Sequence, residues 1–390
     1  MILIKKLILI LKKIFNSKFY FKSPPKKKLV VFDGHSFEHL IHVLKKGECI
    51  ILETRFERIN KFYINKNIIL KTIKNENNNF LSSYLLAVLD EINPKVVFTF
   101  IDNSFRFSEF SEIKKKNYEF VALQNGARYE HKILNEIHRK KIDKLNFKKF
   151  NISHFFCFGS YEIADYKKYN QSIDNFYRVG SLKLSNYMKA KKQKIKNKDY
   201  DILLISDANC WDKILDKLNL PIQKAIIDLI KYTIKFSKKY KYKIKIAARS
   251  FKNDFEDEKE FYKKFLNKEE FNFLLENIFF RSKNYNTYRI MEKSELVIGT
   301  MSTMLRENLA IGGKTLACNF TQSKIFDFPI KGKCFLNQNK YEYFEIRARN
   351  ILKISKKAFH SNISKDPKYI IDNLNTDRLV KTKLRKILEK

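Results

Sequence analysis

The chain has 390 residues, 44% of them hydrophobic and 14% aromatic, which excludes a disordered polyelectrolyte and is enough for two domains of roughly 150 residues each. Its formal net charge of +37 favours an anionic partner, but the lysines are spread along the whole chain and no RNP motif, zinc-finger spacing or arginine-rich arm concentrates them, so we expect no specific nucleic acid. The five cysteines form no CxxC pair, which fits a reducing cytoplasm without disulfides or a zinc site.

Residues 1–22 combine apolar side chains with lysine pairs at 5–6 and 12–13, a seven-residue spacing that places the lysines on one stripe of a helix. The longest apolar run, Leu7–Leu11, is too short to span a bilayer, and no small-residue cleavage site follows it. We expect an amphipathic helix on an anionic membrane surface, with the protein attached peripherally to the inner face of the cytoplasmic membrane. A helix packed on the protein's own core is the alternative.

After a linker at 23–26, apolar runs alternate with helical patterns, the rhythm of a parallel sheet. This predicts a first Rossmann-like domain over residues 26–185. Its expected strands are Leu29–Asp33, Cys49–Glu53, Ile68–Lys71, Val96–Ile101, Tyr118–Leu123 and His154–Phe158, with helices at Ser36–Lys46 and Phe80–Ile92.

A polar, lysine-rich stretch at 183–199 predicts the linker between domains. A second Rossmann-like domain is expected over 199–340, followed by a helical tail, 341–390, that crosses back to the first domain. The predicted fold class is therefore α/β, with two Rossmann-like domains facing a crevice. The second series comprises strand Tyr200–Ser206, helix Pro221–Tyr240, strands Lys243–Ala248 and Asn277–Arg281, and a strand–loop–helix–strand unit over Glu295–Phe320.

The unit at Glu295–Phe320 carries the most specific functional signal. Its first strand ends at Gly299, Ser302 and Thr303 open the helix, and Glu307 lies one turn inside it. A helix N-terminus favours anions such as a diphosphate, and a carboxylate at that position can accept hydrogen bonds from ribose hydroxyls. These residues predict a nucleotide-sugar site. Ser302 and Thr303 are equally suited to plain capping, and Glu307 to a solvated helix surface.

Polar side chains also follow other expected strands. Arg249 follows the strand KIKIA, where its guanidinium could bind a diphosphate in a bidentate manner. An inverting sugar transferase needs a general base, and Asp102, Asp33 and His35 all lie at strand ends that face the crevice. Asp102 is the first choice, and capping of the following helix is the alternative for each.

Gln124 and Asn125, directly before Gly126, offer amide hydrogen bonds to an acceptor sugar, or equally to the loop backbone.

Three histidines could in principle bind a metal ion. His35, His39 and His42 have helical spacing, but the expected core stripe leaves them on the solvated side. The DYD at 199–201 precedes a strand rather than following one. We therefore expect no metal and no cofactor. The stripe consists of Phe37, Leu40, Ile41 and Leu44.

Seven short motifs resemble the bacterial surface-carbohydrate biosynthesis proteins of capsule and lipopolysaccharide loci, which are GT-B-like. This resemblance implies a glycosyltransferase whose C-terminal domain holds a nucleotide-sugar donor and whose N-terminal domain takes a glycan or lipid-linked acceptor. Asn308 after Glu307 and the doubled glycine at 312–313 depart from the commoner pattern and leave the donor open. The motifs are VVFDG (30–34), ILETRFERIN (51–60), VFTFIDN (97–103), VALQNG (121–126), RVGSLK (178–183), AARS (247–250) and GTMSTMLRENLAIGGK (299–314).

Two alternatives remain at this point. The same fold suits a nucleotide-sugar epimerase or a glycerol-phosphate transferase, and the charge suits a non-enzymatic polyanion-binding protein. Donor base and sugar, acceptor, stereochemical outcome and oligomeric state are not encoded in a recognisable motif.

Overall fold

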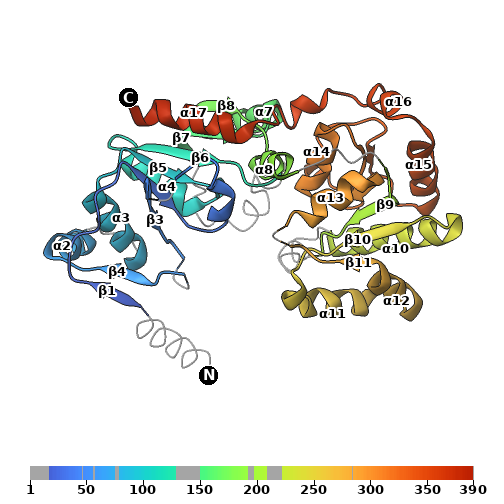
Figure 1. The fold of residues 1–390 in the computed structure, drawn as a ribbon, viewed down its shortest axis with the longest axis horizontal. Coiled ribbons are helices and arrows are strands. Elements are labelled where there is room, and N and C mark those ends of the chain that lie inside the picture. The colour runs from blue at the N-terminus through green and yellow to red at the C-terminus, as the bar shows by residue number, and fades with distance from the viewer. Residues whose placement is uncertain are drawn as a thin grey trace.

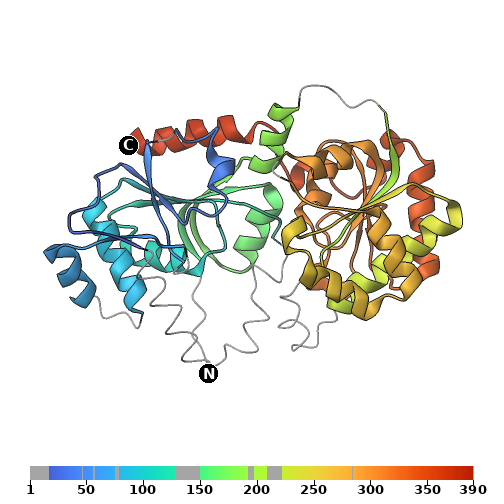
Figure 2. The same cartoon turned by 60° about the horizontal axis from the view of Figure 1, so that its bottom comes forward.

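The computed structural model describes residues 17–45, 47–55, 58–74, 79–128, 150–191, 197–208, 222–282 and 284–389. Two α/β domains lie side by side, and the end of the chain returns to the first of them (Figures 1 and 2). This confirms the predicted fold class of two Rossmann-like domains with a helical tail. Within the described ranges, no helix combines the length and the apolar composition needed to cross a membrane.

The first domain is built on a six-stranded sheet in the order β3-β2-β5-β6-β7-β8, with every neighbouring pair parallel. Its inner strands β2, β5, β6 and β7 are buried almost throughout, as expected for a parallel sheet covered by helices, whereas the edge strands β3 and β8 are partly exposed. The strands are β2 (Leu29–Phe32), β3 (Cys49–Leu52), β5 (Val96–Thr99), β6 (Glu119–Leu123), β7 (Asn151–Cys157) and β8 (Ser172–Arg178).

Alternation along β2 shows how the two faces are divided. Val30 and Phe32 pack in one hydrophobic cluster with α3 and α4, while Leu29 and Val31 belong to a second cluster on the other face. The second cluster includes the C-terminal helix, so a segment distant in sequence completes this core. The helices of this domain are η1 (Phe37–Leu40), α2 (Lys66–Lys74), α3 (Phe80–Ile92), α4 (Phe105–Lys114), α7 (Ser160–Lys168) and α8 (Leu182–Ala190).

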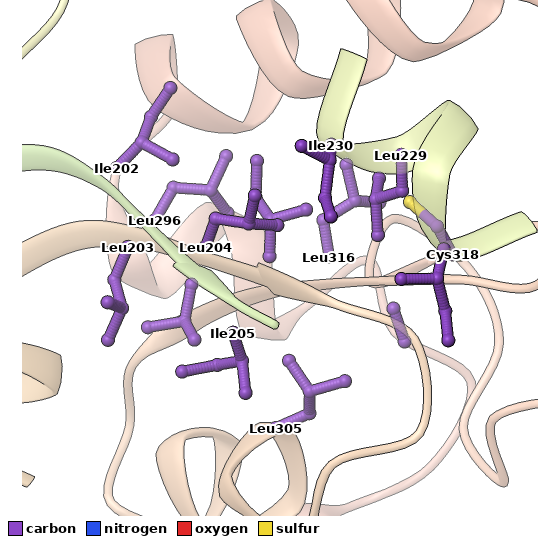
Figure 3. Packing of buried hydrophobic residues seen from close by; sticks show 14 of the residues in the cluster. Ile202, Leu203, Leu204, Ile205, Leu229, Ile230, Leu296, Leu305, Leu316 and Cys318 are labelled. Carbon is purple, nitrogen blue, oxygen red and sulfur yellow. The ribbon is translucent and has the colours of Figure 1, made fainter. Parts of the chain in front are cut away.

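The second domain has the strand order β11-β10-β9-β12-β13-β14, again parallel throughout. Figure 3 shows its core, with Leu229 and Ile230 of α10 on one side of the sheet and Leu305 beside Ile205 on the other. The strands are β9 (Tyr200–Ile205), β10 (Ile244–Ala247), β11 (Ile278–Phe279), β12 (Ser294–Gly299), β13 (Lys314–Cys318) and β14 (Phe335–Leu336). The helices are α10 (Ile222–Tyr240), η2 (Lys252–Asp254), α11 (Glu256–Phe265), α12 (Lys268–Asn277), α13 (Asn286–Lys293), α14 (Thr303–Ala310) and η3 (Lys324–Phe326).

The C-terminal tail is helical and joins the two domains a second time (Figure 1). Phe344 of α15 packs on Phe236 of the second domain, whereas Leu384 of α17 is buried in the core of the first. Ser185 Oγ of α8 donates a hydrogen bond of 2.8 Å to Asp377 at the start of α17. The tail elements are α15 (Tyr341–Lys353), α16 (Lys356–His360), η4 (Pro367–Tyr369) and α17 (Thr376–Glu389).

Three predicted elements differ from the structure. The strand expected at Ile68–Lys71 lies within helix α2, where Ile68 and Thr72 are buried four residues apart against α3. The helix expected at Ser36–Lys46 is helical only as the 3-10 turn η1. The expected linker begins as α8, whose apolar residues are buried, so lysine content concealed an amphipathic helix.

The predicted N-terminal helix over 1–22 is also wrong at its end. Residues 1–16 lie outside the described part, and Lys18–Tyr20 form strand β1, parallel to β4 (Lys61–Tyr63). Phe19 stacks on Phe62 and Tyr20 on Tyr63. These cross-strand aromatic pairs favour the extended conformation over a helix.

Candidate active site

Strand order places the ligand crevice. In each sheet, strands that follow one another in the chain are first added on one side and later on the other. The two adjacent strands at which this direction reverses form the switch point, and ligands of such folds bind outside the carboxyl ends of these strands. The strand order reverses between β2 and β5 in the first domain and between β9 and β12 in the second. The loops that follow these four strands carry residues 33–35, 100–103, 206–207 and 300–302, which include the predicted site residues Asp33, His35, Asp102 and Ser302.

The predicted donor and acceptor loops meet each other at the boundary between the domains. Thr303 Oγ1 accepts a hydrogen bond of 2.7 Å from the Ala127 backbone N–H. A Cβ on Gly126 would lie 3.3 Å from the same Thr303 oxygen, so glycine permits this close approach. Ser302 caps α14, its Oγ accepting from Met304 N–H at 3.3 Å. Both hydroxyls are therefore engaged by protein groups.

The backbone amides predicted to bind a diphosphate hold an internal carboxylate. Asp207 Oδ2 accepts from the N–H groups of Thr300 (3.3 Å) and Met301 (3.0 Å) and from the Thr300 hydroxyl. Sequence reasoning missed Asp207, although it follows the apolar run of β9 just as Asp102 follows that of β5. Gly299 is packed closely, because a Cβ there would lie 3.3 Å from Leu305 Cδ2.

Glu258, on α11, binds the backbone of the loop after β10 as Asp207 binds the loop after β12. It accepts hydrogen bonds from the backbone N–H groups of Arg249 (3.1 Å) and Ser250 (2.9 Å). It also bonds the hydroxyls of Ser206 and Tyr262, which ties the ends of β9 and β10 together. Arg249 is thus held by its backbone.

Glu307 is buried and bonded within the protein. Its carboxylate accepts from Ser181 Oγ at 2.5 Å and from Tyr288 Oη at 3.0 Å. Burial raises the pKa of Glu307, and these two hydrogen bonds offset part of that rise. The partner that a carboxylate on this helix requires is supplied by α8 and α13 rather than left to a ribose.

Three cations from the two domains lie near one another: Lys183, Arg249 and Arg281. Lys183, at the start of α8, interacts electrostatically with Glu307 and Arg281, and burial lowers its pKa. Arg281, after β11, has its pKa lowered by burial and then by the neighbouring Arg249, whose carbonyl accepts from its guanidinium at 3.5 Å. Neither Lys183 nor Arg281 forms a salt bridge with a described carboxylate, so an anion bound here would relieve their mutual repulsion.

Asp33 and His35, after β2, are both held by arginines. Asp33 has a left-handed backbone (φ 69°), and its Oδ2 accepts from Arg55 Nε at 2.8 Å. The Arg58 guanidinium lies 2.8 Å from His35 Nδ1, and because arginine only donates, that nitrogen is the acceptor. Burial, Arg58 and Arg55 lower the pKa of His35. The Asp33 carboxylate and the His35 Nδ1 lone pair therefore each already accept a hydrogen bond from an arginine.

Asp102 is fully buried and paired. Arg128 donates to it from Nε at 2.8 Å and from Nη2 at 2.5 Å, and the Asn125 N–H donates at 3.1 Å. The Asn125 side-chain oxygen accepts from Arg128 at 2.8 Å. Both carboxylate oxygens of Asp102 are therefore engaged by the Arg128 guanidinium, which suits a residue that positions the loop better than one that takes a proton from an acceptor.

Gln124 is likewise buried with its amide used internally. Its nitrogen donates to the Gly126 carbonyl at 2.9 Å and to Glu162 at 3.1 Å, and its oxygen accepts from Phe158 N–H at 2.7 Å. It orders the loop, as its alternative interpretation predicted, instead of presenting an amide to a sugar.

Glu53, after β3, was missed by sequence reasoning although it ends a strand exactly as Asp33 does. Its Oε2 accepts from Gly34 N–H at 3.3 Å, and a Cβ on Gly34 would lie 2.4 Å from Oε1. The carboxylate therefore lies over the glycine at the switch point. Burial raises the pKa of Glu53, and within the described residues no lysine or arginine forms a salt bridge with it.

The histidines do not follow the predicted helix face. His39 is half-buried beside the Phe100 ring, at 6.0 Å between ring centroids, while Ile41, expected in the core stripe, is 62% exposed. The short 3-10 turn rotates these side chains away from α-helical positions. Among the residues that the structure describes, no three His, Cys, Asp or Glu side chains are grouped to hold a metal ion.

Known structures share this two-domain fold. The UDP-GlcNAc 2-epimerase of Methanocaldococcus jannaschii, in complex with UDP-GlcNAc and UDP, matches with a TM-score of 0.53 and 13% identity over 93% of this chain and 99% of that one. The Neisseria meningitidis UDP-GlcNAc 2-epimerase bound to UDP-GlcNAc gives 0.50 and 12%, over 92% and 100%. The wall teichoic acid polymerase TagF gives 0.51 and 11%, over 94% and 90%. No curated protein matches in sequence.

A family model described as "putative O-antigen biosynthesis protein" matches residues 121–329, more than half of the chain. The matched span contains the Gly126 loop, Lys183, Arg249, Arg281 and the whole of α14. It confirms the resemblance to surface-carbohydrate biosynthesis proteins that the sequence motifs indicated. The chain belongs to this family of O-antigen biosynthesis proteins.

Proposed function

We propose that the protein is a glycosyltransferase that moves a sugar from a nucleotide-sugar donor to a glycan or lipid-linked acceptor during O-antigen assembly. The observation that carries this proposal is the cation cluster of Lys183, Arg249 and Arg281, contributed by both domains at the crevice. A donor diphosphate would add negative charge beside Lys183 and Arg281, and guanidinium groups match its oxygens in a bidentate manner. The same cations would stabilise the diphosphate as it leaves.

The donor is expected to be a uridine nucleotide sugar. Two proteins of the same fold are described as bound to UDP-GlcNAc, one of them together with UDP. Shared fold alone does not assign a ligand. It does make UDP the first nucleotide to test.

Glu53 is our candidate for the general base. Asp102 and Asp33 are neutralised by Arg128 and Arg55, and the Nδ1 lone pair of His35 accepts from Arg58. Glu53 keeps a carboxylate at the switch point with only the Gly34 amide as a described partner. The acceptor hydroxyl would give up its proton to Glu53 as its oxygen bonds to the sugar and the diphosphate departs.

The test is calorimetry and thermal shift with UDP, GDP, CDP, CMP and dTDP, on wild type, Lys183→Ala and Arg281→Ala. We expect one nucleotide to stabilise the wild type, and each variant to bind it about tenfold more weakly, the loss of one charged contact. Lys357→Ala, an exposed lysine on α16, is the matched control and should bind normally. Absence of any nucleotide binding by the wild type would overturn the proposal.

Charge stabilisation by three protein cations requires no divalent ion, so the proposal also holds that activity survives chelation. Turnover measured in EDTA should equal that in Mg²⁺ or Mn²⁺. Loss of activity in EDTA with recovery on adding either ion would contradict it.

Epimerisation of a nucleotide sugar is the second candidate, because the whole-chain likeness at a TM-score of 0.53 is to an epimerase. Incubation with UDP-GlcNAc and no acceptor separates the two. An epimerised or hydrolysed sugar in stoichiometric amounts would favour the epimerase, whereas strict dependence on an added acceptor favours the transferase.

A further inference from the structure

Exposed apolar side chains gather on one edge of the first domain. Thirteen large hydrophobic side chains are exposed in the described part of the chain, and six of them belong to β1, its adjoining residue 21, α2 and the first residue of α3. Exposed apolar side chains are normally scattered singly, so a concentration on adjoining elements marks an interaction site. We call these residues the apolar edge: Phe19, Phe21, Ile69, Leu70, Ile73 and Phe80.

Local structure explains why these residues adjoin and remain outside the core. Strand β4, the partner of β1, leads directly into α2. Ile68 and Thr72 turn one side of α2 against α3, which leaves Ile69, Leu70 and Ile73 on its outer side. Figure 1 shows β1, β4 and α2 at the end of the first domain that lies away from the second.

Strand β1 and helix α2, which carry most of the apolar edge, contain lysines and no carboxylate. Helix α2 (KNIILKTIK) contains three lysines and no acidic residue, β1 begins with Lys18, and Lys22 follows it. Lysine stems can lie along apolar surface while their ammonium groups reach outward. The edge therefore combines exposed aliphatic and aromatic side chains with a surrounding layer of positive charge.

We propose that the apolar edge docks on an anionic membrane surface. Apolar side chains at the boundary between headgroups and acyl chains, with lysines at the level of anionic headgroups, are the arrangement that interfacial binding requires. A second copy of the chain fits less well, because it would bring lysines of α2 against lysines. Strand β1 also continues directly from residues 1–16, whose sequence repeats the same mixture of apolar and lysine residues.

This docking places the first domain, which we assign to the acceptor, against the surface where lipid-linked acceptors reside. It does not depend on the proposed transferase activity, because the apolar edge contains none of the crevice residues. Membrane binding and nucleotide binding can therefore fail separately.

The experiment is flotation of the full-length protein with phosphatidylcholine vesicles, with and without phosphatidylglycerol. The apolar variant is Leu70→Asp with Ile73→Asp, and the charge variant replaces Lys66 and Lys74 by Glu; both change only exposed residues. Tyr343→Asp with Ile346→Asp, two exposed residues of α15 in the second domain, is the matched control.

We expect wild type and control to bind vesicles that contain phosphatidylglycerol and to release them at high salt. Each edge variant should bind at least about tenfold more weakly, with an unchanged unfolding temperature. Binding by both edge variants at the wild-type level, or no vesicle binding by the wild type, would overturn the proposal. A drop in oligomeric mass in the edge variants without any vesicle binding would identify a second copy as the occupant instead.

Discussion

At the scale of single residues, neighbouring carboxylates differ in the charge that faces them. Asp33 and Glu53 follow adjacent parallel strands, yet Asp33 is paired with Arg55 at 2.8 Å, while Glu53 accepts only the Gly34 amide among described groups. Arg58 and Arg55 also act on Glu53 and lower its pKa, but burial raises that pKa by more. This difference in partners is the reason for assigning proton transfer to Glu53.

Glu53→Gln should lower kcat by about 10²-fold or more, the usual contribution of a general base, with little change in donor binding. Because burial raises the pKa of Glu53 above its ordinary 4.5, activity should fall as pH decreases through that raised value, when the base becomes protonated. Steady-state kinetics across pH checks both. The control is Glu48→Gln at the opposite end of β3, and an unchanged kcat in Glu53→Gln would assign the base elsewhere.

At the scale of elements, sequence patterns located most strands and two of the helices: the helix expected at Phe80–Ile92 is α3, and the one expected at Pro221–Tyr240 is α10. Apolar runs followed by glycine or a polar residue predicted β2, β3, β5, β6 and β9 within a residue or two at each end. The run at 68–71 was assigned to a strand because a short apolar stretch fits a strand and a buried helix segment equally well. Helix α8 was not predicted because its lysines made the segment read as a polar linker, although Leu184 and Tyr187 are buried.

The candidate site shows a similar division. Strand ends identified where Asp33, Asp102 and Thr303 lie, because parallel strands bring their carboxyl ends to one edge. Which of them are already paired depends on partners far away in sequence: Arg128 lies 26 residues from Asp102, and Ala127 lies 176 residues from Thr303. The first pairing follows from the packing of loops within one domain and the second from the packing of two domains, and no local sequence pattern encodes either.

The turn η1 supplies a prediction about pH. Burial, with Lys183 as the next cause, lowers the pKa of His39 from 6.5 to about 4, so His39 is neutral in the folded protein at pH 6. As pH falls from 6.5 towards 4, the unfolded chain gains a proton that the folded protein does not take up. Stability is thus lost over this window. In His39→Gln, urea unfolding between pH 7 and 4 should show a smaller loss than wild type.

His42→Gln, an exposed histidine three residues further on, is the matched control and should retain the wild-type pH dependence. Equal slopes for His39→Gln and wild type would mean that His39 takes up its proton in the folded state as readily as in the unfolded one.

At the scale of the whole molecule, α14 connects the two domains. Thr303, Arg306 and Glu307, within two turns of one helix, bond to Ala127, Glu162 and Ser181 of the first domain. The helix that the sequence singled out as a nucleotide site therefore also makes polar contacts between the domains.

The Arg306–Glu162 pair is the most deeply buried of these contacts, with both side chains inaccessible to solvent and 2.6 Å between Nη1 and Oε1. Arg306 also donates to the Arg128 carbonyl at 2.6 Å. Arg306→Met should destabilise the protein by about 3–5 kcal/mol, because it leaves the Glu162 carboxylate buried without its cation. Adding Glu162→Gln removes that charge and should restore part of the loss.

Urea unfolding of the two single variants and the double variant gives the coupling energy of the pair, which we expect to be about 1–3 kcal/mol. Burial already raises the pKa of Glu162, so in Arg306→Met the carboxylate gains stability by taking up a proton, and the deficit should shrink as pH falls towards 4.5. Arg349→Met, an exposed arginine of α15, should stay within about 0.5 kcal/mol of wild type. A coupling energy near zero would mean that the domains are held together without this pair.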